Sequence, residues 1–79
     1  MNVVLDRYAA KKLERTNEPL KSRIINALNG LREKPPQGDV KKLQGRYDYR
    51  LRIGDYRVLF RIENNMIIVT NIAPRGHVY

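Results

Sequence analysis

The first part of the sequence predicts a short strand followed by a helix. Residues 2–5 form an apolar run of strand length, and Asp6, directly after them, is a residue type that caps helix N-termini. Apolar residues then recur at helical spacing, at Ala9, Ala10 and Leu13. We expect this helix to end near Thr16–Asn17.

A second helix is predicted to follow at once. Asn17 is expected to cap it, and Pro19 is tolerated in its first turn because N–H groups there lack helical partners. The apolar stripe of this helix repeats every three or four residues: Leu20, Ile24, Ala27, Leu28 and Leu31. The basic residues off this stripe, interpreted as a solvated face, are Lys21, Arg23, Arg32 and Lys34.

The spacing changes from helical to alternating after Lys34-Pro35-Pro36-Gln37-Gly38-Asp39, which we interpret as a rigid turn. Alternating or apolar runs at 47–53, 56–63 and 66–72 predict three strands. Gly54-Asp55 and Asn64-Asn65 are of the residue types that form tight hairpin turns. The face that Asn71 takes depends on the exact length of the second turn and is left open.

These elements predict an α+β fold in a single domain spanning residues 1–79. The N-terminal strand joins the edge of a three-strand antiparallel meander, giving a four-stranded sheet. The two-helix hairpin packs on one face of that sheet, and the other face is left open for function.

The hairpin register places arginines together on the open face. With a two-residue turn, the pairs that point away from the helices are Asp48–Arg61, Arg50–Leu59 and Arg52–Arg57. Asp48–Arg61 is ordinary charge compensation, but two arginines directly opposite each other are destabilising. An anion bound between them would relieve this cost. The guanidinium is a planar fork suited to phosphate, so we favour a phosphate-binding face over a merely solvated one.

The charge of the chain supports a polyanionic partner. Sixteen Lys and Arg against eight Asp and Glu give a net charge of +8. Domains this basic commonly bind nucleic acid. Residues 41–61 contain seven basic and two acidic residues. The residues that we expect to bind RNA or phosphate are Lys41, Lys42, Arg46, Arg50, Arg52 and Arg61.

Several classes of chemistry are disfavoured by composition. There is no cysteine and only one histidine, so neither a disulfide framework nor a conventional histidine metal site is expected. Glycine-rich nucleotide motifs are absent, and Ser22 is the only serine. We therefore expect no metal and no cofactor. A signal peptide and a membrane span are not predicted, and the expected location is the cytoplasm.

The remaining chemistry is the cleavage of RNA, which carries its own nucleophile, the 2′-OH. The enzyme must then stabilise the extra negative charge on the phosphate and move two protons. Arginines can do the first, and a tyrosine or histidine can do the second. Such residues lie together in Arg75-Gly76-His77-Val78-Tyr79, although His77 on a surface or Tyr79 in the core would also be ordinary.

The sequence resembles the RelE/ParE superfamily of bacterial and archaeal toxins over essentially its whole length. The order of the elements carries the resemblance, together with Lys42-Leu43-Gln44-Gly45, residues 49–60 (YRLRIGDYRVLF) and the ending at 75–79. RelE-type members are metal-independent, ribosome-dependent endoribonucleases that cut mRNA in the A site and are neutralised by an antitoxin. The resemblance implies a cognate antitoxin, the ribosome and mRNA as partners, with no membrane and no small-molecule cofactor.

The resemblance also implies catalytic roles. Arg57 matches the arginine after the hairpin that stabilises the phosphate. Arg75 matches a late-strand arginine that stabilises the transition state or protonates the leaving group. Tyr79 matches a C-terminal tyrosine that positions the base and stacks on it. Arg50 and Arg52 stand where RelE has lysines. Because arginine does not give up its proton, the general base is expected to be Tyr79 or His77.

Two alternatives remain open at the level of sequence. One is a ParE-like inhibitor of DNA gyrase, which has the same fold and needs no catalytic constellation. The other is a non-enzymatic RNA- or ribosome-binding module, which would bind RNA with strong salt dependence and leave it intact.

Overall fold

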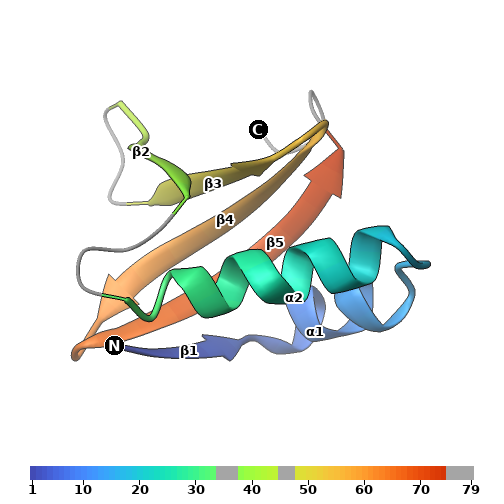
Figure 1. Cartoon of the computed structure of the whole chain (residues 1–79). Helices are drawn as coiled ribbons and strands as arrows, with labels where there is room; N and C mark the ends of the chain where they lie inside the picture. Colours follow the sequence, from blue (N-terminus) through green and yellow to red (C-terminus); the bar gives the residue numbers. More distant parts are fainter. Residues whose placement is uncertain (34–37, 45–47, 75–79) are drawn as a thin grey trace.

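Two helices and a five-stranded sheet make up the computed structural model, which describes residues 1–33, 38–44 and 48–74 (Figure 1). The elements in chain order are β1 (Asn2–Leu5), α1 (Arg7–Glu14), α2 (Leu20–Gly30), β2 (Asp39–Lys42), β3 (Tyr49–Ile53), β4 (Tyr56–Glu63) and β5 (Met66–Pro74). The strand order is β1-β5-β4-β3-β2, and only the β1–β5 pair among these described strands is parallel. The α+β fold, the helix pair and the edge position of β1 are confirmed.

The sheet has one strand more than the four predicted. Asp39–Lys42 form β2, which pairs antiparallel with β3 at the other edge. The expected turn between the halves lies largely outside the described residues, since 34–37 are among those not described. Gly38 stands just before β2 with φ +112°, and a Cβ there would lie 2.8 Å from Leu51 Cδ1. A residue with a side chain would be strained at this positive φ, so glycine is favoured here.

The start of α1 is as predicted, but the start of α2 is not. The Asp6 carboxylate accepts a hydrogen bond from the Ala9 N–H at 2.8 Å, which caps α1. The expectation that Asn17 caps α2 is wrong. Pro19 occupies the cap position without a side-chain hydrogen bond, and Glu18 Oε1 accepts from the Ser22 N–H at 2.9 Å instead. A carboxylate in this position also interacts favourably with the positive end of the helix dipole.

The core lies between the helices and one face of the sheet. The predicted stripe of α2 is confirmed, since Ile24, Leu28 and Leu31 are buried against sheet residues. On α1, Ala9 is buried, but Ala10 is exposed, contrary to the prediction. Alanine is small enough to be accommodated on either side of a helix, so its spacing is weak evidence of burial.

A β-bulge in β5 decides the orientation of Asn71. The Asn64-Asn65 turn has two residues, both with positive φ (50° and 61°), as in a type I′ hairpin turn. Further along, Phe60 pairs with Val69 whereas Leu59 pairs with Asn71, so Thr70 is the extra residue of the bulge. The bulge reverses the alternation, and Asn71 therefore lies on the face away from the helices.

Candidate phosphate-binding face

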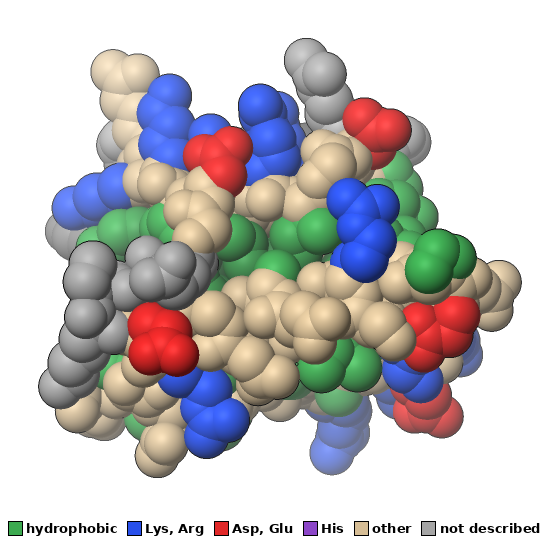
Figure 2. Space-filling view, viewed as in Figure 1, with side chains coloured by type: hydrophobic (Ala, Val, Ile, Leu, Met, Phe, Trp, Pro, Cys, Tyr) green, Lys and Arg blue, Asp and Glu red, His purple; other side chains and the backbone are tan. Residues whose placement is uncertain are grey.

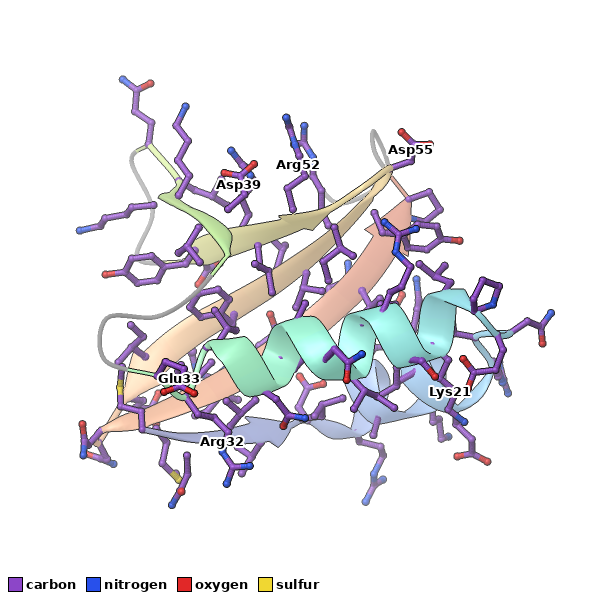
Figure 3. The ribbon with its side chains drawn as sticks, viewed as in Figure 1. Lys21, Arg32, Glu33, Asp39, Arg52 and Asp55 are labelled. Atoms are coloured by element: carbon purple, nitrogen blue, oxygen red, sulfur yellow. The ribbon has the colours of Figure 1, made fainter. Side chains whose placement is uncertain are left out.

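The face of the sheet away from the helices carries the predicted arginines. We define the arginine face as Arg50 and Arg52 of β3, Arg57 of β4, and their neighbours in the adjoining strands on the same side. Figure 3 shows Arg52 and Asp39 projecting from the sheet on the side away from α2. In Figure 2, Lys and Arg side chains gather along the upper edge of the molecule, above the hydrophobic interior.

The predicted register of the hairpin is confirmed. Arg52 lies opposite Arg57, and Arg50 lies opposite Leu59. The two-residue turn at Gly54-Asp55 produces this register, and Gly54 adopts φ +56°, a conformation that glycine accepts without strain. The like-charged pair is therefore a property of the fold, held in place by the backbone pairing of β3 and β4.

Arg50 is built into the sheet and is not a freely available cation. It is only 9% exposed and is the one buried charged residue among those described. Its Nη1 donates to the Asp39 carbonyl oxygen at 3.4 Å and lies 3.7 Å from the Asp39 carboxylate. Because a buried charge is costly unless it is paired, this contact with β2 offsets part of the burial of Arg50.

Arg52 and Arg57 differ from Arg50 in their exposure. Arg52 is exposed, and its guanidinium makes no hydrogen bond or ion pair with another described residue. Arg57 is half-buried, and the register places it opposite Ala73 of β5. Ala73 and Leu59 form a small buried apolar patch, against which Leu43 packs. The arginines thus lie beside a small buried apolar patch on the face of the sheet away from the helices.

The remaining predicted cations are more scattered. Lys41 lies opposite Arg50 on the arginine face, but Lys42 lies opposite Tyr49, a residue packed against the core on the helix side. Arg61 is exposed and pairs with Glu63 at 3.1 Å. Asp48, its expected partner, precedes the first residue of the β3–β4 pairing. Four predicted residues lie outside the described part of the chain: Arg46, Arg75, His77 and Tyr79.

Sequence reasoning missed Asp39 as a residue of this face, and it left the orientation of Asn71 open. Asp39 lies opposite Arg52 as well as close to Arg50, which places a carboxylate among the cations. The alternation Asp39-Val40-Lys41 was its only sequence signal, and it is too short to predict a strand. The bulge that turns Asn71 has no local sequence signal that we recognise.

The described residues contain neither a cluster of metal-ligand side chains nor a helix able to span a membrane. Within residues 1–33, 38–44 and 48–74, no three His, Cys, Asp or Glu side chains are grouped in a way that could hold a metal ion. Neither α1 nor α2 has the length and apolar character needed to cross a bilayer. On the described part of this face, the chemistry is that of guanidinium groups.

Comparison with solved structures shows the same fold in toxin–antitoxin complexes. A RelE–RelB complex from the archaeon Pyrococcus horikoshii contains a chain 28% identical to this one, with a TM-score of 0.78 and coverage of 98% of this chain and 97% of that chain. The RelB–RelE complex from Methanococcus jannaschii (21% identity, TM-score 0.79) covers 96% of this chain and 94% of that chain. The RelBE2 complex from Mycobacterium tuberculosis (19%, TM-score 0.78) covers 94% and 96%.

The family comparison covers nearly the whole chain. A search of curated proteins found no match. Residues 3–79 match the family model described as the ParE toxin of type II toxin–antitoxin systems, parDE. Together with the shared fold, this match confirms the resemblance to the RelE/ParE superfamily. The chain belongs to the ParE toxin family of type II toxin–antitoxin systems.

Proposed function

We propose that this toxin is a metal-independent endoribonuclease that cleaves mRNA on the ribosome and so inhibits translation. The observation that carries the proposal is the cross-strand pair Arg52–Arg57. Like charges facing each other on adjacent strands destabilise a sheet, and an RNA phosphate bound between them would remove the repulsion. Guanidinium groups are suited to this role because they donate two parallel hydrogen bonds to phosphate oxygens.

The proposed reaction is an in-line attack by the ribose 2′-OH on the adjacent phosphorus. A bond forms from the 2′-oxygen to phosphorus and the bond to the 5′-oxygen breaks, leaving a 2′,3′-cyclic phosphate and a 5′-OH. Arg57 stabilises the charge that develops on the phosphate oxygens, and Arg52 binds the backbone nearby. Arg50, which contacts Asp39, does not bind RNA in this scheme and instead connects β3 to β2.

The two proton transfers require groups other than these arginines, since arginine stays protonated. We assign the acceptance of the 2′-OH proton to Tyr79 or His77. Arg75 stabilises the negative charge on the 5′-oxygen as it leaves, and that oxygen takes its proton from water to give the 5′-OH. This assignment extends the sequence resemblance to residues outside the described part of the chain. Tyr79→Phe and His77→Ala, tested separately, identify which of the two side chains is required.

A cognate antitoxin is part of the same proposal. The similar chains from Pyrococcus horikoshii and Methanococcus jannaschii were solved as complexes of RelE with RelB. The net charge of +8 favours a partner segment that is acidic or amphipathic. By covering the arginine face, such a segment would block access to RNA. A small open reading frame for such a protein beside the toxin gene is the observation to seek.

A second function is favoured by the family model itself, which is that of ParE toxins. A ParE-like toxin would inhibit DNA gyrase by binding it, and the arginine face would then be a docking surface. This alternative predicts that the protein blocks supercoiling by purified gyrase and leaves mRNA intact.

The deciding experiment is a cell-free translation reaction in which mRNA 5′ ends are mapped with and without ribosomes. We expect cuts at codon-phased positions only when ribosomes are present. A gyrase supercoiling assay with the same preparation runs in parallel. Intact mRNA together with inhibited supercoiling would contradict the nuclease and support the alternative.

A further inference from the structure

Asn71 lies on the arginine face because of the bulge at Thr70. Val69 pairs with Phe60 on the helix side, and in a regular strand Asn71 would point to that same side. The extra residue instead places Asn71 opposite Leu59, diagonal to Arg57. Thr70 Oγ1 donates to the Leu59 carbonyl oxygen at 3.4 Å, which ties the bulge to β4. Bulges often re-aim a side chain beside a functional site.

The carboxamide of Asn71 has an acceptor that none of the described residues uses. Its Oδ1 is buried and has no hydrogen-bond donor among the residues that the structure describes. Buried polar atoms in proteins are nearly always paired, because leaving one unpaired costs the free energy of its desolvation. An unused acceptor at this position points to a partner that arrives with the ligand.

The surroundings restrict what that partner can be. Arg52 and Arg57 can only donate hydrogen bonds, and in the proposed function they bind the phosphates of the RNA strand. The Asp39 carboxylate already lies against Arg50, 3.7 Å from its Nη1. Asn71 is therefore a neutral group on the described part of this face that can both accept and donate, since a half-turn of its amide exchanges Oδ1 and Nδ2. A ribose hydroxyl has the same dual character.

We infer that Asn71 is the residue by which the arginine face distinguishes RNA from DNA, through a hydrogen bond with a 2′-OH beside the bound phosphate. The inference rests on the proposed function and adds the sugar to what the site recognises. Phosphate contacts are the same for RNA and DNA, whereas the 2′-OH is the group that tells them apart. Asn71 acts on binding and position, and it takes no proton in the reaction.

The test is binding of the full chain, without ribosomes, to three single strands of one sequence: RNA, DNA and 2′-O-methyl RNA. Fluorescence anisotropy is measured over a range of salt concentrations. Wild type is expected to bind RNA about three- to tenfold more tightly than DNA. This ratio of affinities corresponds to the free energy of one neutral hydrogen bond. The 2′-O-methyl strand, which has no hydroxyl proton to donate, is expected to bind as DNA does.

Asn71→Ala should remove this preference while leaving the salt dependence unchanged, because the number of phosphate contacts stays the same. Asn71→Ser keeps a small hydroxyl and should retain part of the preference. Asn26→Ala, at an exposed position of α2, serves as the matched control and should bind as wild type. Circular dichroism confirms that each variant folds.

The outcomes distinguish the role of Asn71 from the binding of phosphate by the arginines. An RNA preference that persists in folded Asn71→Ala, or wild type that binds RNA and DNA equally, overturns the role of Asn71 and leaves phosphate binding intact. If wild type shows no salt-dependent binding to any of the three strands, both the role of Asn71 and the proposed binding of RNA by this face are overturned.

Discussion

The two faces of the sheet are built from the same strands and have opposite character. On the helix side, β4 presents Val58 and Phe60, both at most 2% exposed and packed against the helices. On the other side, the same strand presents Arg57, and β3 presents Arg52 directly opposite it. Strand alternation makes this division possible within two adjacent strands. Stability is concentrated on one face, so the other can hold charges that repel each other.

The largest expected effect is on the helix-covered face. Phe60→Ala removes a ring that is 2% exposed and stacks on Tyr49 with centroids 5.4 Å apart. Loss of a buried phenylalanine typically lowers the free energy of unfolding by about 3–5 kcal/mol. Urea denaturation measures the loss. A drop of less than about 1 kcal/mol would show that the core depends little on this strand.

On the arginine face, the corresponding loss should appear in activity and not in folding. Arg57→Ala is expected to reduce mRNA cleavage about 10²–10³-fold, the effect of removing one donor to a developing oxyanion. The rate is read from primer extension in the translation reaction. Arg32→Ala, which removes the same charge at an exposed site after α2, should cleave like wild type. Full toxicity of folded Arg57→Ala would contradict the proposed role.

A smaller effect, in which a substitution raises the free energy of unfolding, would distinguish the two faces more directly. Arg52→Thr replaces one member of the like-charged pair with a good strand former and should raise the free energy of unfolding by about 0.2–1 kcal/mol. The same substitution should weaken RNA binding and reduce its salt dependence. Thermal unfolding and anisotropy measure the two quantities. A variant that loses both stability and binding would show that Arg52 supports the fold.

The smallest expected effect concerns pH and belongs to the helix side. Hydrogen bonds from the side chain and backbone of Ser22 lower the pKa of Glu18 below its ordinary value. A carboxylate with a lowered pKa in the folded state contributes stability above its unfolded pKa, and this is lost as the pH falls through the folded value. In Glu18→Gln, the free energy of unfolding should therefore fall slightly less steeply as the pH is lowered. An unchanged profile would mean that the helix start does not depend on this charge.

Much of the fold could be predicted from the sequence because its signals are local. The hairpin register followed from a two-residue turn, which fixes the pairing of Arg52 with Arg57. The fifth strand, β2, did not have such a signal, since four residues with little alternation form a strand only where β3 offers an edge. Whether a short segment pairs is decided by tertiary context and not by its own propensity.

The candidate site was predicted in outline and not in detail. Spacing alone brought three arginines to one face, but it could not show that Arg50 is buried and contacts Asp39. That contact depends on the unpredicted β2. The orientation of Asn71 depends on the bulge at Thr70, and the alternation of apolar residues in β5 does not reveal where such an extra residue lies.

The position of β5 in the sheet has a consequence for the order of events during synthesis. This strand lies between β1 and β4 (Figure 1), although it is the last of the described elements to be translated. Neither of its neighbours can complete its pairing until residues 66–74 have emerged from the ribosome. Contacts between segments distant in sequence also form late in folding. A nascent chain of this toxin thus remains without a finished sheet, and without a finished arginine face, while most of it is being made.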